Sequence, residues 1–276
     1  MANELQRTTE WYLARKGKIT ASECYVLLNN SKEEVPLTQE EQEQFRSEHP
    51  RAKMPETKKV EVPFSLGTYT YLDEKVAEMY MPENSFIEYV EDRPSNKAMQ
   101  FGTFWEDDAR NRYVEATGYE VLDSPFVPLK CFENFAGGSP DGIIRNSPDA
   151  DAPGTTADGG FKGIIEIKCP FNPAVHLRHF LYEKPEDLKE DNLQYYVQCQ
   201  YNMLCVSKQF DTDVEFCDFI SYDPRTSRSK QLKVLRIPAD IEMQNTLLFR
   251  TKLAVDYLRG RIERINKMPS VINEYK

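Results

Sequence analysis

The chain has 276 residues, of which 40% are hydrophobic and 29% are charged. This length and composition predict one large globular domain over residues 1–276 and exclude collagen-like, coiled-coil and wholly disordered classes. The 45 acidic residues outnumber the 35 lysines and arginines, and the formal net charge of −10 argues against a protein that coats nucleic acid indiscriminately. Because no apolar run is long enough to span a bilayer and residues 1–15 lack the apolar core of a signal peptide, we expect a cytoplasmic protein with no membrane partner.

The N-terminal part of the chain has a helical pattern that is interrupted once. Residues 8–28 predict a short helix, a break at Gly17 and a second helix that begins near Thr20 or Ser22. Residues 29–62 are rich in Glu, Lys, Gln and Pro and show little apolar periodicity. We interpret them as a charged insertion that forms a mostly exposed loop or a loose helix.

The rest of the chain alternates between helical and strand patterns. Helices are predicted over 69–80, 97–117 (ended by Gly118), 192–206 and 239–267, and strands over 119–122, 126–129, 136–144, 163–169, 214–222 and 231–237. An extended loop, rich in Gly, Pro and Asp, occupies 145–162. This order predicts an α/β fold with a mixed central β-sheet flanked by helices.

Charge is unevenly distributed along the chain. Residues 72–92 contain seven acids and one base, and we expect this stretch to lie away from any bound polyanion. Residues 223–267 contain eleven bases and five acids. They could form a cationic strip that faces a polyanion, although an ordinary solvated helix face explains the same pattern.

Cysteine and histidine give no sign of a metal cluster. The six cysteines include no C-x-x-C pair and are too sparse for a disulfide framework, so we interpret them as reduced thiols and assign neither zinc nor an iron–sulfur cluster. The pair His176 and His179 could be half of a metal site. With three histidines in the chain, an exposed pair on a helix or loop is the favoured interpretation.

The most informative pattern is Asp141, in a Ser-Pro-Asp-Gly turn, followed by Glu166 and Lys168 on an apolar strand. Alternate strand residues share a face about 7 Å apart, and a hairpin would bring Asp141 beside Glu166. Two carboxylates at short range repel unless a cation lies between them, and Mg²⁺ prefers such hard oxygen ligands. Lys168 would orient or deprotonate an attacking water, with its pKa lowered by burial and the metal. Alternatively, Asp141 caps a turn and the other two form a surface ion pair.

Five blocks of the sequence resemble one known family. They are WYLARKGKITASE (11–23), FGTFWEDDARNRY (101–113), GGSPDGII (137–144), GIIEIKCPF (163–171) and YYVQCQYNM (195–203). In this order they are similar to the motifs of the lambda-exonuclease, or YqaJ-like, branch of the PD-(D/E)xK nucleases. The resemblance implies a PD-(D/E)xK, or restriction-endonuclease-like, core.

The resemblance also implies roles for individual residues. Asp141, Glu166 and the main-chain carbonyl of Ile167 would hold the metal, Lys168 would be the catalytic lysine, Glu106 would reach the metal through water, Gln198 would be the active-site glutamine, and Arg15 and Ser22 would hold a 5′-phosphate. Each of three residues also has a simpler interpretation: an i,i+4 ion pair of Glu106 with Arg110, a helix-surface position for Gln198 and an exposed cation for Arg15.

The family activity that the resemblance implies is hydrolysis of one strand of linear double-stranded DNA in the 5′ to 3′ direction, which leaves a 3′ single strand. One or two Mg²⁺ ions, replaceable by Mn²⁺, would serve as cofactor. A homotrimeric ring and a single-strand annealing protein of a phage recombination system would be the partners. The segments 29–62, 63–96 and 145–162 depart from the family pattern. A Cas4-like or RecB-like DNA-end-processing nuclease and a non-catalytic DNA-end-binding scaffold are the alternatives.

Overall fold

The computed structural model describes residues 6–145 and 161–269, and its centre is a five-stranded sheet with the strand order β10-β9-β8-β7-β4. The strands are β4 (Val121–Leu122), β7 (Gly142–Arg145), β8 (Phe161–Lys168), β9 (Phe216–Tyr222) and β10 (Leu232–Pro238). The neighbours β8 and β9 run parallel, and the other pairs are antiparallel. The sheet is therefore mixed, as predicted.

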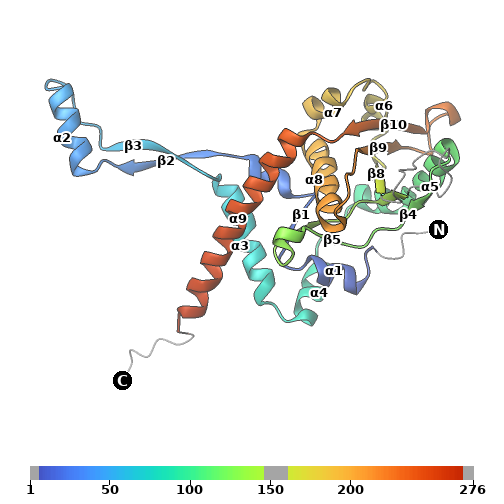
Figure 1. Cartoon of the computed structure of the whole chain (residues 1–276), viewed down its shortest axis with the longest axis horizontal. Helices are drawn as coiled ribbons and strands as arrows, with labels where there is room; N and C mark the ends of the chain where they lie inside the picture. The colour runs from blue at the N-terminus through green and yellow to red at the C-terminus, as the bar shows by residue number, and fades with distance from the viewer. Residues whose placement is uncertain (1–5, 146–160, 270–276) are drawn as a thin grey trace.

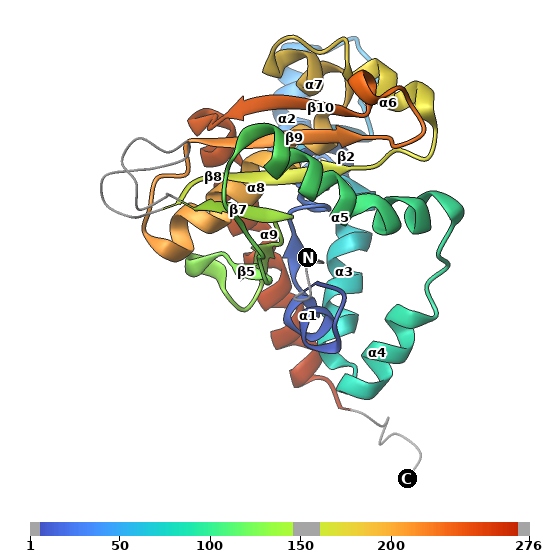
Figure 2. The same ribbon diagram turned by 90° about the vertical axis from the view of Figure 1, so that its right-hand side faces the viewer.

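A long helix covers each face of this sheet. Alternate residues of a strand point to opposite faces. Ile164 of β8 accordingly packs into a core beneath α8 (Leu193–Phe210), whereas Ile165 and Ile167 pack with Ala109 and Tyr113 of α5 (Lys97–Thr117). Figure 2 shows the strands in the order β10, β9, β8 and β7, with α5 and α8 on either side. Both helices were predicted from their apolar periodicity.

The connection from β8 to β9 explains why these two strands are parallel. Parallel neighbours require a crossover, which is usually helical. Here it comprises α6 (Pro173–His179), α7 (Pro185–Asp191) and α8. Since α8 is the last part of the crossover, the chain places this helix directly beside the end of the strand that carries Glu166 and Lys168.

The predicted strand over 136–144 is in fact two strands in different sheets. β6 (Ala136–Gly138) joins β1 (Ile19–Thr20) and β5 (Val127–Pro128) in a three-stranded sheet, whereas β7 belongs to the central sheet. The intervening Ser139-Pro140-Asp141 segment breaks the strand because proline has no N–H to donate. Gly142 is required just after it, since a Cβ there would lie 2.4 Å from Val121 Cγ1.

The insertion at 29–62 is not a loop or a loose helix. It forms an arm of β2 (Ser31–Pro36) and β3 (Thr57–Val62), paired antiparallel, with α2 (Gln39–Glu48) between them. Figure 1 shows this arm extending away from the rest of the molecule. A capping box between Thr38 and Glu41 starts the helix. The helix was not predicted because its sequence contains few apolar residues. The arm is mostly exposed, as predicted for this segment.

The elements not yet described lie outside the central sheet. They are α1 (Thr9–Arg15), the 3₁₀ turns η1 (Cys24–Leu28), η2 (Lys130–Phe132) and η3 (Arg228–Lys230), and the helices α3 (Leu66–Tyr80), α4 (Glu83–Glu91) and α9 (Ile241–Lys267). The second helix predicted within 8–28 is shorter than expected. It is the 3₁₀ turn η1, which buries Cys24 and Leu27. Within 6–145 and 161–269, no helix has the length and apolar character needed to cross a membrane. The predicted turn at 147–160 lies outside the described residues.

Candidate active site

Asp141 lies in contact with strand β8. Its main-chain N–H donates to the carbonyl of Ile165 at 3.1 Å, and its Oδ2 accepts from the N–H of Ile167 at 2.6 Å. Glu166 is 1% exposed, and Lys168 Nζ donates to its Oε1 at 2.7 Å. The structure therefore brings Asp141, Glu166 and Lys168 together. The alternative of a surface ion pair is wrong, because the glutamate is buried.

Helix α8 supplies the polar partners of these side chains. Gln198 Oε1 accepts from Lys168 Nζ at 3.1 Å, and the ring of Tyr195 lies 4.7 Å from the same ammonium group. Asn202 Nδ2 donates to Glu166 Oε2 at 3.0 Å. Gln198 is thus buried in the site and is not a helix-surface residue. Asn202 was missed from the sequence, although its place four residues after Gln198 puts both on one helix face.

Glu106 of α5 reaches the same site, and the alternative of an ion pair with Arg110 is not found. Its Oε2 instead lies 2.5 Å from the guanidinium of Arg7. Arg110 is buried, pairs with Asp123 at 3.2 Å and donates a hydrogen bond to the main-chain carbonyl of Asp141. Arg110 therefore fixes the backbone that carries the aspartate, and Arg7 is a second cation that sequence reasoning missed.

The charges at this site are incompletely balanced. Burial, followed by repulsion from Glu166 and Glu106, raises the pKa of Asp141 well above its ordinary value. Burial also raises the pKa of Glu166, although Lys168 and Asn202 act in the opposite direction. Burial alone would lower the pKa of Lys168, but the carboxylates of Glu166 and Asp141 raise it above its usual range. The predicted lowering of the lysine pKa is therefore not found, and the lysine is a cation that donates hydrogen bonds.

The donor set at this site fits a hard divalent cation. Asp141 and Glu166 present carboxylate oxygens at a place where repulsion already disfavours two negative charges, and a cation would relieve that repulsion. Ile167, the third predicted ligand, lines the same cavity as Lys168 and Glu106. Among the described residues, no three Asp, Glu, His or Cys side chains converge as a ready-made metal cluster. This is compatible with Mg²⁺, which accepts one or two carboxylates and completes its shell with water or phosphate oxygens.

A second cavity, of about 200 Å³, contains Arg15 and Ser22. Arg15 Nη1 donates to the hydroxyl of Ser139 at 3.0 Å, and its guanidinium lies 4.2 Å from the centroid of the Trp11 ring. Burial lowers the pKa of Arg15, partly opposed by the carboxylate of Glu23. The residue is therefore not the exposed cation of the simpler interpretation. Ser139 lies two residues before Asp141 and connects this cavity to the active site.

The lining of this cavity is mixed in charge. Its cations are Arg15, Lys75 and Arg93, and its acids are Glu23 and Glu78. Lys75 lies 3.2 Å from Glu23 and 3.4 Å from Glu78, and Arg93 lies 3.1 Å from Glu78. One positive charge is left over, which suits a bound anion. Because Lys75 and Glu78 come from the acidic stretch 72–92, that stretch does not lie wholly away from this cavity.

His176 and His179 are buried, and the predicted exposed pair is wrong. Each Nδ1 lies 2.8 Å from the hydroxyl of Ser221, and His176 Nε2 lies 2.7 Å from the carbonyl of Lys230. A carbonyl can only accept, so His176 carries its proton on Nε2 and its Nδ1 accepts from the serine. His179 then donates through Nδ1. Burial and the neighbouring His176 lower the pKa of His179 to about 4, which keeps His179 neutral at pH 7.

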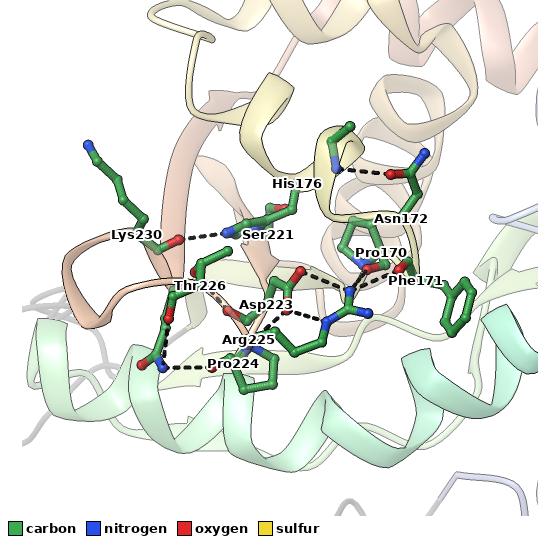
Figure 3. A network of polar contacts seen from close by, with 12 residues as sticks. Pro170, Phe171, Asn172, His176, Ser221, Asp223, Pro224, Arg225, Thr226 and Lys230 are labelled. Carbon is green, nitrogen blue, oxygen red and sulfur yellow. Dashed lines mark hydrogen bonds and ion pairs between the residues drawn. The ribbon is translucent and has the colours of Figure 1, made fainter.

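Arg225 fixes the segment that follows β8. Its guanidinium makes two hydrogen bonds to Asp223, at 2.8 and 2.9 Å, and donates to the main-chain carbonyls of Pro170 and Phe171. Figure 3 shows Arg225 placed between Asp223 and these two carbonyls. The same guanidinium lies 4.2 Å from the centroid of the Phe101 ring on α5. It therefore joins α5, β9 and the end of β8 next to Lys168.

The basic residues of 223–267 are largely used inside the molecule. Arg250 is buried and donates to the carbonyls of Leu27 and Pro63. Other pairs are Arg225–Asp223, Arg236–Asp218, Lys252–Asp256, Arg261–Asp73 and Lys267–Glu263. These contacts weaken the expectation of a cationic strip for these six bases, because each of the six already has an acidic or carbonyl partner.

Comparison with known proteins connects this geometry to a family. A family model described as the YqaJ-like viral recombinase domain matches residues 10–213, which is most of the chain. The chain belongs to the YqaJ-like viral recombinase family. The matched region contains Arg15, Ser22, Glu106, Asp141, Glu166, Ile167, Lys168 and Gln198. No curated protein shows significant similarity to this member of the family.

Several solved structures have a fold similar to that of this chain. An alkaline exonuclease (LHK-Exo) from Laribacter hongkongensis is 24% identical, with a TM-score of 0.60, over 94% of this chain and 97% of that one. The same exonuclease in complex with dAMP gives a TM-score of 0.62 at 24% identity and the same coverage. A phage-related exonuclease from Haemophilus somnus 129PT is 15% identical, with a TM-score of 0.50, over 90% and 96% of the two chains. The fold is thus the PD-(D/E)xK type found in these exonucleases.

Proposed function

We propose that this protein is a Mg²⁺-dependent exodeoxyribonuclease that hydrolyses one strand of linear double-stranded DNA from the 5′ end and leaves a 3′ single strand. The observation that carries the proposal is the convergence of Asp141, Glu166 and Lys168 at one end of β8, inside a YqaJ-like domain. Buried carboxylates of raised pKa beside a half-buried lysine are costly for stability, and such sites are candidates for catalysis.

Asp141, Glu166 and the carbonyl of Ile167 would hold one or two Mg²⁺ ions, or Mn²⁺ in their place. The bound cation would activate water and stabilise charge on the phosphoryl group and on the leaving oxygen. Lys168, as a cation, would donate to a phosphoryl oxygen or orient the attacking water. Gln198 would hold the lysine in place through the 3.1 Å hydrogen bond. Glu106 would act through water at the edge of the site.

The cavity around Arg15 supports a 5′-end preference. A guanidinium binds phosphate with two parallel hydrogen bonds, and the hydroxyl groups of Ser22 and Ser139 can add donors. Because Ser139 lies two residues before Asp141, a terminal phosphate in this cavity would place a nearby phosphodiester close to the carboxylates. The solved complex of the similar alkaline exonuclease with dAMP supports a mononucleotide as product.

The proposed partners follow from the family. The enzyme would act on double-stranded DNA ends as a homotrimeric ring and deliver the 3′ single strand to a single-strand annealing protein during phage recombination. The name of the matching family, a viral recombinase domain, supports this setting. A mass measurement in solution tests the ring, with three chains per particle as the expected result and one chain per particle as the contrary one.

Linear duplex DNA, labelled separately on each strand and carrying a 5′-phosphate or a 5′-hydroxyl, provides the test of the activity. We expect Mg²⁺-dependent loss of the strand that bears the 5′-phosphate, release of mononucleotides and little attack on closed circles. Cleavage of circles would favour a Cas4-like or RecB-like end processor or an endonuclease. Binding to ends without cleavage in Mg²⁺ or Mn²⁺ would favour the non-catalytic scaffold.

Arg15→Ala tests the end preference within the same assay. Loss of a charged hydrogen-bond donor to phosphate costs about 1.5 to 3 kcal/mol, so the preference for 5′-phosphate over 5′-hydroxyl should fall by roughly tenfold or more. Arg46→Ala is the matched control, because Arg46 lies exposed on α2 of the arm. An unchanged preference in Arg15→Ala would remove this residue from the end pocket.

A further inference from the structure

Residues 6–8, just before α1, lie beside the candidate active site, and a hydrogen bond holds each end of this segment. Gln6 Nε2 donates to the carbonyl of Pro140 at 3.1 Å, and the hydroxyl of Thr8 accepts from the N–H of Trp11 at 3.1 Å and caps α1. Arg7 lies between these anchors. The segment is therefore attached on one side to the turn that carries Asp141 and on the other to the helix that carries Arg15.

Arg7 has a backbone conformation that few residues adopt. Its φ is +62°, and Asp211, at the end of α8, is the other non-glycine residue with positive φ in the described ranges. The left-handed conformation costs a residue with a Cβ roughly 1 to 2 kcal/mol. The strain directs the side chain of Arg7 to Glu106, at 2.5 Å, in a cavity of about 340 Å³ that Lys168 also lines.

A structural role does not account for this arrangement. The Arg7 side chain is 42% exposed, whereas that of Glu106 is 13% exposed. An ion pair with one partner this accessible contributes about 0 to 1 kcal/mol, which does not exceed the cost of the backbone strain. Arg7 also differs from Lys168, which is fixed by hydrogen bonds to Glu166 and Gln198. Of these two cations, Arg7 is the one free to exchange its partner.

We infer that Arg7 is a DNA-binding residue whose guanidinium exchanges Glu106 for a backbone phosphate of the strand that enters the active site. This inference rests on the proposed function. Guanidinium is planar and forms paired hydrogen bonds with phosphate as readily as with carboxylate, so the exchange replaces one charged partner by another. It also frees Glu106 to act at the metal site. The anchors at Gln6 and Thr8 keep the arginine at the cavity during the exchange.

DNA binding without hydrolysis tests the inference directly. Fluorescence anisotropy in EDTA would give the Kd for a 5′-phosphorylated duplex over a range of salt concentrations for wild type, Arg7→Gln, Arg7→Lys and Arg46→Gln. The slope of log K against the logarithm of the salt concentration becomes shallower by about 0.9 for each lost contact to a duplex phosphate. For a single strand the change is about 0.7 per contact. We expect Arg7→Gln to bind roughly tenfold more weakly with a slope reduced by about one such contact. Arg7→Lys should keep the slope, and Arg46→Gln should match wild type.

Glu106→Gln provides a variant with the opposite expected sign. It removes the carboxylate that competes with phosphate for Arg7, so the Kd for DNA in EDTA should be equal to or lower than that of the wild type. Wild-type affinity and salt slope in Arg7→Gln would overturn the inference. Weaker binding with an unchanged slope would also overturn it, because that result indicates a disturbed fold and not a lost phosphate contact. If wild type itself neither binds DNA ends nor cleaves them with Mg²⁺, the proposed function fails. If wild type cleaves and Arg7→Gln binds normally, only the role of Arg7 fails.

Discussion

Two carboxylates on neighbouring strands are buried to the same extent, but their negative charges are neutralised to different degrees. Glu166 on β8 and Asp218 on β9 are each 1% exposed. Asp218 accepts two hydrogen bonds from Arg236, at 2.9 and 2.8 Å, and one from Tyr113 at 2.6 Å. Its single negative charge has its own guanidinium, and the Tyr113 bond fixes α5 on the sheet.

The environment of Glu166 is crowded with like charges. Asp141 and Glu106 lie near it, and Lys168 and Arg7 are the cations beside the three carboxylates. The pKa of both Asp141 and Glu166 is raised, so the folded chain disfavours their ionised forms. The comparison shows that burial alone does not mark a functional group. A structural carboxylate is neutralised within the chain, whereas the candidate catalytic ones are left to attract a cation.

Lys168→Ala should have the largest effect on activity. It removes the half-buried cation proposed to contact the phosphoryl group, and loss of one such donor lowers turnover by a factor of about 10² to 10³. Single-turnover degradation of phosphorylated duplex measures the loss, and anisotropy in EDTA should show DNA binding within a few fold of wild type. Full activity in this variant would remove the lysine from the mechanism.

Asp218→Ala should show the reverse pattern. Removing Asp218 leaves the buried Tyr113 hydroxyl without its acceptor and the half-exposed Arg236 without its partner, and we expect the free energy of unfolding to fall by about 1 to 3 kcal/mol. Urea denaturation measures this change. Turnover at a temperature where the variant remains folded should stay within a few fold of wild type. A large loss of activity with unchanged stability would contradict the distinction between the two carboxylates.

Asp141→Asn should raise stability at neutral pH while it abolishes activity. A carboxyl group with a raised folded-state pKa contributes stability below its unfolded pKa, near 4, and loses that contribution as the pH rises through the raised value. At pH 7.5 the ionised aspartate therefore costs stability, and the amide removes this cost while its oxygen still accepts from Ile167. We expect the Tm to rise by a few degrees, corresponding to roughly 1 kcal/mol.

The pH dependence gives the control for this variant. At pH 4 the difference in Tm between Asp141→Asn and wild type should shrink, because Asp141 is then protonated in the folded chain and about half protonated in the unfolded chain. Asp108→Asn, at an exposed position of α5, should leave the Tm unchanged at both pH values. A destabilised Asp141→Asn at pH 7.5 would show that the carboxylate at this position is structural.

The grouping of Asp141, Glu166 and Lys168 could be predicted from the sequence because its signals are local. The i,i+2 spacing on an apolar strand places Glu166 and Lys168 together, and the proline and glycine around Asp141 mark the turn. The helices that flank the sheet also follow from their periodicity. Gln198 was identified by the family resemblance, and the structure places it against the lysine.

Contacts between distant segments could not be predicted in this way. The pairing of Arg7 with Glu106 joins residues 99 positions apart, and the one between Arg15 and Ser139 joins residues 124 apart. The burial of His176 and His179 depends on Ser221 of another element. The arm at 29–62 was misjudged because its strands face solvent and therefore lack the apolar alternation by which strands are recognised.

The central claim is that a divalent cation binds between the carboxylates of Asp141 and Glu166. An anomalous difference map from crystals of the wild-type protein grown with Mn²⁺ tests it directly. The account predicts a peak within coordination distance of both carboxylates and of the Ile167 carbonyl, and its absence from Asp141→Asn crystals. A map with no peak at this site, or with the two carboxylates turned apart around an ion bound elsewhere, would contradict it.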